Sequence, residues 1–467
     1  MEQLRRDVVI VGAGATGLTA AVRLREFGYS VLVLEARDRI GGRLLTDHIE
    51  GQMFEVGGQW VSPDQSALLE MLDELGLKTY DRYRDGDSIY IGTDGVAKRF
   101  AGTELPVNAH TKTEIDRLTA EIDALAAQID PAAPWSHPRA AEFDHISFLE
   151  WLMQQSNDAE ARANIALFIA DAMLTKPAHA FSLLQALLMA ASAGSFSHLL
   201  DADFILDKRV VGGLQQVPLL LAAQLSPDDV RLAQPVRRIR WSPDQPTDSA
   251  NEALVEVSTD ELTVIARQVI VAVPPNLYNR IEYLPNLPRL RQQLQQHQSL
   301  GLVIKVHASY ETPFWREKGL SATAFSPYQV VHEAYDNSNH GETRGTLVGF
   351  VSDEKADSLF RLSAPERKQR ILESFASYFG DEALSPVVYY ESDWAAEEWT
   401  QGAYAASFDL GGLTRYGALQ LEPVGPLRFG SSDLAAEGYQ HVDGAIRVGQ
   451  RLAAEVSQSI AVAVTTP

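Results

Sequence analysis

A glycine pattern directly after an apolar run near the amino terminus constrains the fold more than any other feature of the chain. The run covers 8–11 and is typical of a buried strand, and the glycines that follow complete G-x-G-x-x-G at Gly12, Gly14 and Gly17. The first glycine permits a tight turn, the second allows a pyrophosphate to approach the backbone, and the third allows the following helix to pack on the strand. The N-terminus of that helix offers free N–H groups to an anion. The pattern therefore predicts a Rossmann-type dinucleotide-binding unit.

An acidic residue closes the second apolar run. This run covers 31–34 and ends at Glu35. A carboxylate at this place accepts hydrogen bonds from a ribose 2′-OH, which favours an adenosine dinucleotide without a 2′-phosphate. A glycine-rich turn without a ligand is the alternative, and the ordered succession of strand, glycines, helix, strand and acid argues against it.

Composition bounds the classes of function. The chain has 467 residues, of which 45% are hydrophobic, enough for two domains with large cores. Its net charge of −22 argues against a nucleic-acid partner, and the absence of cysteine excludes disulfides and thiolate metal sites. No apolar run reaches the length of a membrane span, and the first residues enter a strand at once instead of forming a signal peptide. A cytoplasmic protein without a membrane or metal partner is expected.

Apolar periodicity and turn residues predict the other elements. Helices are expected near 65–77, 111–129, 146–173 and 180–193, after Leu214 and from about Asp443, and strands at 230–241, 253–257, 269–273, 302–309 and 346–351. The expected class is α/β. We expect a Rossmann-like dinucleotide-binding domain (1–80, 205–290 and 395–467) interleaved with a discontinuous α+β substrate domain (81–204 and 291–394).

Several segments resemble the flavin amine oxidases. Arg39-Ile-Gly-Gly-Arg43 and Phe54-Glu-Val-Gly-Gly-Gln-Trp60 resemble that family's extension of the dinucleotide motif. Segments 174–181, 190–196, 402–408 and 437–444 extend the resemblance over nearly the whole chain, to the monoamine oxidase-like group and most closely to bacterial putrescine oxidases. The resemblance implies FAD, the flavin amine oxidase fold and a homodimer.

The resemblance also implies which residues contact FAD. Ala403 stands where cysteine-linked members carry their flavin bond, so the cofactor is expected to be noncovalent. The expected contacts are Gly12, Gly14, Ala15, Thr16, Gly17, Glu35, Ala36, Arg37, Gly42, Arg43, Gly57, Gly58, Gln59, Trp60, Val236, Trp394, Ala403, Ser432, Asp433, His441 and Val442.

Three residues match catalytic positions of the family. Lys305 lies in an apolar strand and matches a lysine that contacts flavin N5 through a water; a lysine at a strand edge is the alternative. Tyr404 matches one wall of an aromatic cage through which the amine approaches, although it and Trp394 could be ordinary core aromatics. His441 is at the expected position of the second wall, with Tyr439 as the alternative and a structural histidine as the other interpretation.

Glu333 is the residue expected to determine which class of amine the site accepts. It lies among apolar neighbours on an expected pocket-lining strand, where oxidases of simple aromatic amines tend to have a neutral residue. A buried carboxylate needs a cation, and a diamine brings one on its distal end. Periodicity alone would make Glu333 an exposed edge-strand acid, whereas the resemblance makes it a substrate residue together with Tyr404 and His441.

The resulting prediction is an FAD-dependent oxidase of a primary aliphatic diamine, putrescine first. It would use oxygen and release an aminoaldehyde, ammonia and hydrogen peroxide. The flavin carries the redox chemistry, and the protein orients the amine. Cadaverine, spermidine or a cyclic or aromatic amine are alternative substrates, and a non-catalytic flavoprotein is the alternative of another class.

Overall fold

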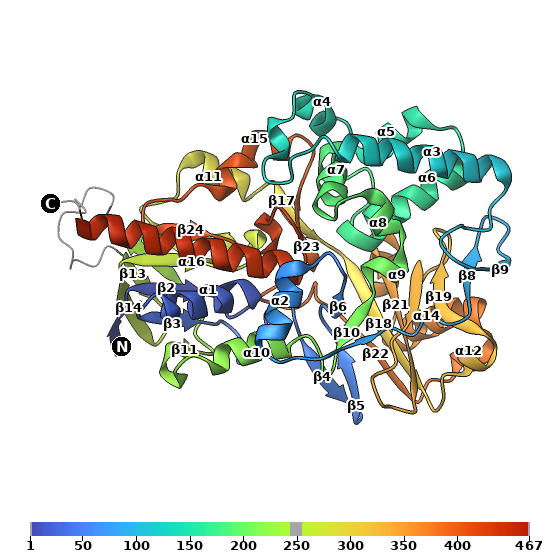
Figure 1. Ribbon diagram of the computed structural model, residues 1–467, viewed down its shortest axis with the longest axis horizontal. Coiled ribbons are helices and arrows are strands. Elements are labelled where there is room, and N and C mark those ends of the chain that lie inside the picture. The colour runs from blue at the N-terminus through green and yellow to red at the C-terminus, as the bar shows by residue number, and fades with distance from the viewer. Residues whose placement is uncertain (1, 243–254, 466–467) are drawn as a thin grey trace.

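The computed structural model describes residues 2–242 and 255–465, with side chains to 461. A five-stranded, wholly parallel sheet forms the centre of one half of the molecule (Figure 1). The predicted strands at 8–11 and 31–34 are confirmed as its middle. In spatial order it contains β11 (Val230–Arg231), β3 (Val31–Leu34), β2 (Val8–Val11), β15 (Gln268–Val271) and β24 (Leu427–Phe429).

Both faces of the parallel sheet are covered, which explains why its strands are continuously apolar. Along β2, Val8 and Ile10 join the core beneath α1 (Ala15–Glu26) and α16 (Val442–Thr465). Val9 and Val11 face the opposite way and join the core shared with a second sheet. In order that sheet contains β1 (Glu2–Arg5), β14 (Leu262–Ala266), β13 (Val255–Ser258), β12 (Arg238–Trp241) and β16 (Glu282–Leu284).

A seven-stranded sheet forms the other half of the molecule. Its strands pair antiparallel except for β19 and β8, which are parallel. One face packs on α14 (Ala364–Phe379) through a second apolar core, and the other face looks toward the helical layer. In order the sheet contains β22 (Val388–Glu391), β18 (Val303–Tyr310), β21 (Gly345–Ser352), β20 (Glu333–Asp336), β19 (Leu320–Phe325), β8 (Asp87–Ile91) and β9 (Ala97–Phe100).

A helical layer lies over this sheet at the upper right of Figure 1. The helix predicted at 111–129 begins two residues earlier because the Asn108 side chain accepts from the N–H groups of His110 and Thr111. The layer contains α3 (Ala109–Ala126), α4 (Ala140–His145), α5 (Phe148–Gln155), α6 (Ala159–Ala166), a π-helical segment (Leu167–Leu174), α7 (Leu183–Ser192), α8 (Phe196–Leu200) and α9 (Ala202–Ile205).

Shorter elements complete the two halves and the segments between them. They are β4 (Thr46–Ile49), β5 (Gln52–Glu55), β6 (Trp60–Val61), α2 (Ser66–Glu74), β7 (Thr79–Asp81), β10 (Lys208–Val210), α10 (Gln216–Ala223), α11 (Arg289–Leu294), β17 (Gln298–Gly301), α12 (Phe314–Glu317), α13 (Asp353–Phe360), β23 (Ala403–Phe408) and α15 (Gly412–Tyr416).

Two predicted elements were wrong in their extent. The helix near 146–173 is three segments, because Asp158 caps a new helix by accepting from the N–H of Ala161. The strand at 230–241 is two strands in different sheets, since Pro235 has no N–H to donate to a ladder and Ala233 has a φ of 53°. Of the strand at 253–257, residues 253 and 254 lie outside the described residues.

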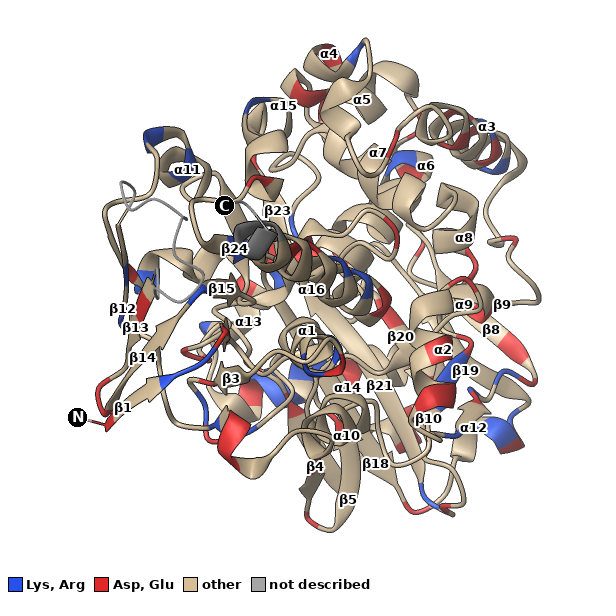
Figure 2. Cartoon of the chain, turned by 60° about the vertical axis from the view of Figure 1, so that its left-hand side comes forward, with Lys and Arg blue, Asp and Glu red and all other residues tan. Residues whose placement is uncertain are grey.

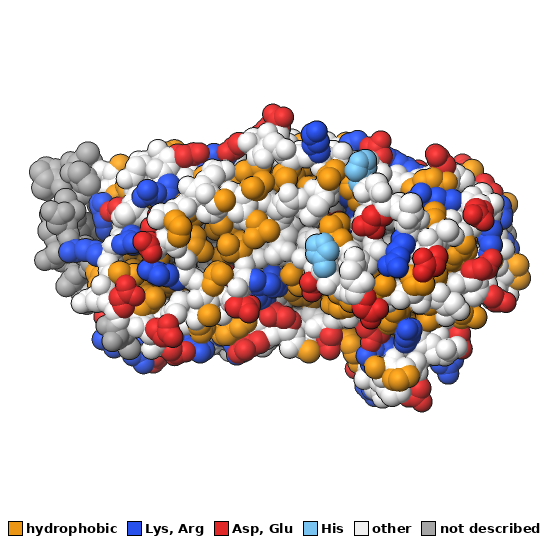
Figure 3. Space-filling model, turned by 90° about the horizontal axis from the view of Figure 1, so that it is seen from below, with side chains coloured by type: hydrophobic (Ala, Val, Ile, Leu, Met, Phe, Trp, Pro, Cys, Tyr) orange, Lys and Arg blue, Asp and Glu red, His pale blue; other side chains and the backbone are white. Residues whose placement is uncertain are grey.

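Charges of both signs cover the described surface. Figure 2 shows Asp and Glu in both halves with Lys and Arg among them. On the face seen in Figure 3, apolar side chains gather in the middle and acidic and basic groups alternate around them, so that face offers no continuous basic surface to a polyanion. Within 2–242 and 255–465 there is no helix with the length and hydropathy of a membrane span, and no group of three or more His, Asp or Glu side chains suited to a metal ion.

Candidate active site

One cavity of about 320 Å³ joins the glycine turn to the cavity-facing side of the seven-stranded sheet. It begins at Gly12 and Glu35 and extends past Lys305 to Glu333. All the residues that the sequence predicted for the site line this cavity, except Gly17 and Asp433. Segments 12–60, 392–404 and 431–445, far apart in sequence, thus meet at one place.

The glycine turn fits a pyrophosphate. A Cβ on Gly12, whose φ is 108°, would lie 2.8 Å from the Ala272 carbonyl oxygen, and one on Gly17 would lie 2.1 Å from the Gly12 carbonyl oxygen. These two glycines are therefore required by the packing of the chain itself. A Cβ on Gly14 would meet no protein atom within 4 Å. Gly14 is also the N-cap residue of α1. Because glycine has no side chain to accept from the first N–H groups, the helix N-terminus stays open to an anion.

Glu35 lies at the carboxyl end of β3, where a ribose would be bound. One carboxylate oxygen accepts from the backbone N–H of Ala13 at 2.7 Å, and the other accepts from the N–H of Arg37 at 3.0 Å. The Arg37 guanidinium also approaches the second oxygen, at 3.5 Å. A carboxylate has about four acceptor sites, so one remains for a ribose hydroxyl. The fit to an adenosine ribose is good.

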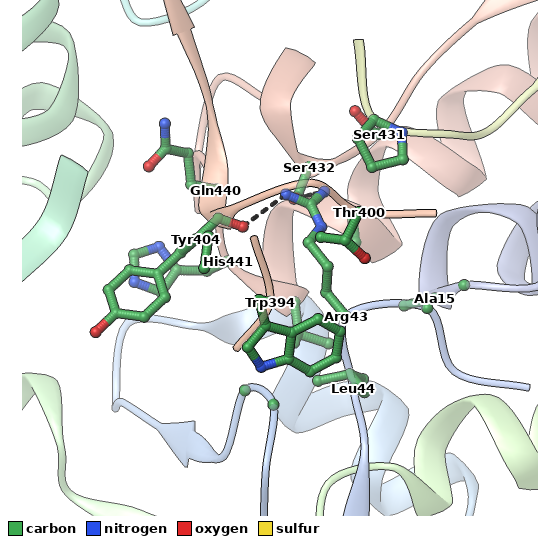
Figure 4. Close-up of a pocket in the computed structure, with 18 of the residues that line it drawn as sticks. Ala15, Arg43, Leu44, Trp394, Thr400, Tyr404, Ser431, Ser432, Gln440 and His441 are labelled. Atoms are coloured by element: carbon green, nitrogen blue, oxygen red, sulfur yellow. Dashed lines mark hydrogen bonds between the residues drawn. The ribbon is translucent and has the colours of Figure 1, made fainter. Parts of the chain in front are cut away.

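Arg43 reaches the cavity and is held from behind by Asp433. The Asp433 carboxylate accepts from both terminal guanidinium nitrogens, at 2.6 and 3.1 Å, and the Arg43 guanidinium also donates to the Tyr404 carbonyl oxygen (Figure 4). Burial alone would raise the pKa of Asp433, but Arg43 and a hydrogen bond from Ser431 hold it below its usual value. The Asp433 side chain thus meets the cavity through Arg43, and its predicted contact with the cofactor stays a prediction.

The ammonium of Lys305 has three protein acceptors. Its Nζ donates to the carbonyl oxygens of Glu55 and Gly57, both at 2.7 Å, and to Gln59 Oε1 at 2.6 Å. Burial lowers the pKa of Lys305 to about 7, against the opposing charge of Glu55. All three ammonium protons are therefore used to hold the 55–59 segment, and a water bridge to a flavin requires one of them to be shared.

A buried ion pair that the sequence analysis did not identify lies beside Lys305. Two guanidinium nitrogens of Arg209 donate to one oxygen of Glu55 at 2.8 and 2.9 Å, and the backbone N–H of Leu214 donates to the other at 2.7 Å. Both side chains are essentially inaccessible, at 1% and 0% exposed. The ion pair could have been found from the sequence, because Glu55 and Arg209 carry opposite charges inside apolar strands and each therefore needs a partner.

Tyr404 and His441 face the cavity together. Tyr404 lies on β23 with its ring edge-on to Phe350, and burial raises its pKa well above 10. His441 immediately precedes α16, and its Nδ1 lies 2.9 Å from the Tyr439 carbonyl oxygen. The alternative Tyr439 points into the protein, where its hydroxyl donates to the Ala406 carbonyl oxygen. Figure 4 shows the Tyr404 and His441 side chains next to each other, so the pair available for a cage is Tyr404 and His441.

Trp394 forms another part of the wall. Its indole N–H donates to the Val56 carbonyl oxygen at 3.2 Å, and the Arg39 guanidinium lies 6.0 Å from its ring centre. The hydrogen bond fixes the plane of a large aromatic side chain at the cavity. Its predicted packing against a flavin ring stays a prediction.

Glu333 is buried, and among the described residues one hydrogen-bond donor reaches its carboxylate. The hydroxyl of Tyr335 donates to one carboxylate oxygen at 2.8 Å, and His332 Nε2 lies 3.6 Å from the other. The residue is 7% exposed and lines the cavity. No Lys or Arg among the described residues forms an ion pair with it. A buried carboxylate so poorly compensated is costly, and a cation entering the cavity would remove that cost.

Strand register sets the separation between the two buried charges. Lys305 on β18 pairs with Phe350 on β21, and Phe350 pairs with Glu333 on β20. Side chains at directly paired positions share a face of the sheet. Two strand spacings separate the backbones at Lys305 and Glu333 by roughly 10 Å, with the Phe350 ring between them.

Comparisons with known proteins agree with this geometry. The model of flavin containing amine oxidoreductases matches residues 15–457. A putrescine oxidase of Kocuria rosea is 60% identical over 97% of this chain and 95% of that protein. A solved structure of wild-type putrescine oxidase bound to putrescine is 62% identical, with a TM-score of 0.94 over 97% of this chain and 99% of that one.

More distant relatives retain the fold. Cyclohexylamine oxidase from Brevibacterium oxydans IH-35A is 29% identical, with a TM-score of 0.91 over 98% of this chain and 99% of that one. The parallel sheet with its glycine turn and the seven-stranded sheet facing one shared cavity are thus the flavin amine oxidase fold, and the chain belongs to the flavin containing amine oxidoreductase family.

Proposed function

We propose that this protein is an FAD-dependent oxidase of short aliphatic diamines, with putrescine as the first substrate. The observation that carries the proposal is Glu333, a carboxylate that lines the cavity, is 7% exposed and has one hydrogen-bond donor and no Lys or Arg partner among the described residues. The distal ammonium of a diamine supplies the missing cation. The similarity to putrescine oxidases supports the same substrate.

The α1 N-terminus and Gly14 would hold the pyrophosphate of FAD, and Glu35 would hold its ribose. The cofactor would supply the redox chemistry, namely hydride acceptance from the amine α-carbon and electron transfer to oxygen with formation of hydrogen peroxide. Ala403 has no nucleophilic side chain and the chain has no cysteine, so we infer noncovalent FAD. Acid precipitation should release the flavin into the supernatant, and flavin fluorescence that stays with the denatured protein would contradict the inference.

The protein's own residues hold the diamine at two places. Tyr404 and His441 orient the reacting amine, which must be neutral to lose hydride, and Glu333 keeps the distal amine charged. Lys305 fixes the 55–59 segment beside the reacting end. The imine product is hydrolysed to aminoaldehyde and ammonia, and no metal or protein nucleophile is needed for either step.

Anaerobic flavin reduction tests the proposal. Purified protein should be yellow and should bleach with putrescine, then regain its colour in air with release of hydrogen peroxide and ammonia. Butylamine, which has the same chain without the distal ammonium, and benzylamine are the controls. Equal rates for all three amines would refute the diamine assignment, and no bleaching with any amine would favour the non-catalytic flavoprotein.

Several finer inferences accompany the proposal. We infer a cytoplasmic homodimer whose FAD-binding domain comprises 1–80, 205–290 and 395–467 and whose substrate domain comprises 81–204 and 291–394. Sedimentation of the flavin-loaded protein tests the dimer, since a mass of 51.3 kDa per chain separates monomer from dimer clearly. Cadaverine and spermidine carry the same distal charge, so their rates relative to putrescine measure the length preference of the cavity.

A further inference from the structure

Tyr335 lies two residues beyond Glu333 on β20 and therefore faces the same side of the sheet. Its hydroxyl donates to Glu333 Oε2 at 2.8 Å. We infer that Tyr335 is a positioning residue, which fixes the Glu333 carboxylate in the orientation that receives the distal ammonium of a diamine. The inference rests on the proposed function and adds a residue that determines specificity without itself binding the ammonium.

The Tyr335 ring is immobilised by its surroundings. Trp60 and Phe325 each meet it edge-on at 5.9 Å between ring centres, and the Arg82 guanidinium lies 5.4 Å from the ring centre. Tyr335 is 3% exposed. Glutamate, by contrast, has three rotatable side-chain bonds, and ordering such a side chain costs free energy. The fixed hydroxyl therefore orders the flexible carboxylate before any ligand arrives.

Arg82 is itself anchored, so the support extends to the cavity wall. Its guanidinium donates to Asp203 at 2.7 Å, to Thr323 Oγ1 at 3.1 Å and to the Leu206 carbonyl oxygen at 3.1 Å. Leu206 lines the cavity, and Asp203 belongs to α9 beside it. The cation over the ring and the wall of the cavity are thus parts of one hydrogen-bonded unit.

His332 offers the carboxylate a competing orientation. Its Nε2 lies 3.6 Å from Glu333 Oε1, and neither ring nitrogen has a hydrogen-bond partner within the described part of the chain. A carboxylate that lost the Tyr335 hydroxyl could turn toward this histidine. Burial and the nearby charge of Glu333 raise the pKa of Tyr335 well above 10, so the hydroxyl remains a donor at working pH. The hydrogen bond from Tyr335 therefore holds the Glu333 carboxylate away from His332 and in the orientation that faces the ligand.

The test is Tyr335→Phe, which keeps the ring packing and removes the donor. Ordering one flexible side chain on binding costs about 0.5–1.5 kcal/mol, so the dissociation constant for putrescine should rise roughly 2- to 10-fold. It is measured from the concentration dependence of anaerobic flavin reduction by the flavin-loaded enzyme. The limiting reduction rate and the constant for butylamine should stay unchanged, because neither depends on the distal ammonium.

A double-mutant cycle separates positioning from packing. In the Glu333→Gln background, Tyr335→Phe should no longer change putrescine binding. Tyr310→Phe is the matched control, since Tyr310 is equally buried on the same sheet and its hydroxyl donates to the Ala383 carbonyl oxygen outside the cavity. This control should leave both amines unaffected, and the flavin absorbance of each variant verifies its fold.

The outcomes distinguish this inference from the function on which it rests. Equal weakening of putrescine and butylamine by Tyr335→Phe, or the same factor with and without Glu333, would overturn the positioning role. If Glu333→Gln alone affected both amines equally, the proposed function would fail as well. A selective effect of Glu333→Gln without one of Tyr335→Phe would leave the function standing and remove Tyr335 from it.

Discussion

The two buried charges of the cavity are treated in opposite ways. Lys305 and Glu333 are 5% and 7% exposed and lie two strands apart on one face of the same sheet. Lys305 donates to three protein acceptors, whereas Glu333 accepts from one tyrosine hydroxyl. The fold surrounds the Lys305 amine with hydrogen-bond acceptors and gives the Glu333 carboxylate a single donor among the described residues. The Lys305 end should therefore contribute to stability, and the Glu333 end to substrate choice.

The largest effect on stability is expected at the Lys305 end, from Glu55→Gln. The change leaves Arg209 buried without its anion, which costs about 3–5 kcal/mol in free energy of unfolding. Urea unfolding of the flavin-loaded protein measures it. Glu142→Gln, which removes the acid of an exposed ion pair, is the control and should leave the free energy of unfolding nearly unchanged. Similar losses for both variants would contradict the contrast between buried and exposed pairs.

Lys305→Met should have the next largest effect. It leaves the acceptors of the 55–59 segment without their donor, and a buried acceptor left unsatisfied costs about 1–3 kcal/mol. We expect a loss of that size in the free energy of unfolding near pH 9, where the neutral amine still donates and carries no charge penalty, together with slower flavin reduction or reoxidation in stopped-flow traces. Lys98→Met, on the exposed edge strand β9, is the control. Unchanged stability and unchanged rates would show that Lys305 is needed neither for the fold nor for the flavin half-reactions.

The pH dependence of stability at the Lys305 end has a definite sign. The pKa of Lys305 is lowered from 10.5 to about 7, so between these values the unfolded chain holds a proton that the folded chain has released. The free energy of unfolding should therefore rise with pH across this window, by about 1.4 kcal/mol per unit at most from this group. The free-energy cost of burying the protonated Lys305 is fully present below pH 7. Lys305→Met should remove this contribution, and equal slopes for both proteins would contradict it.

The smallest effect on stability is expected at the other end of the cavity. Glu333→Gln keeps the shape and removes a buried charge that lacks a Lys or Arg partner. The free energy of unfolding should stay the same or rise by about 1 kcal/mol, in contrast to Glu55→Gln. Thermal unfolding without amine measures it. A marked loss of stability would mean that the carboxylate is compensated within the folded protein.

Much of the fold could be predicted because it depends on local pattern. The strand at 8–11, the glycines and the acid at Glu35 are contiguous signals of one βαβ unit. The partners of Lys305 had no such signal, since two of them are backbone carbonyls about 250 residues away. Pairing of strands distant in sequence brings them together, and apolar periodicity does not specify it.

The candidate site shows the same division between local and distant information. The choice between His441 and Tyr439 depended on the register of the 437–444 segment, since a slip of two residues exchanges them, and both precede α16. Asp433 could be matched to the site by resemblance, but its position behind Arg43 depends on packing. Tyr335 could have been found, because an acid and a tyrosine two residues apart on a strand face the same side.

The most direct test of the contrast between the two charges is the effect of Glu333→Gln on kcat/KM for putrescine and for butylamine at one pH. Losing one partner of a buried charge pair costs about 2–5 kcal/mol, so the value for putrescine should fall by roughly one and a half to three and a half decades. The value for butylamine should stay the same or rise, because its alkyl end no longer meets a carboxylate. Equal losses for the two amines would contradict the assignment of Glu333 to the distal ammonium.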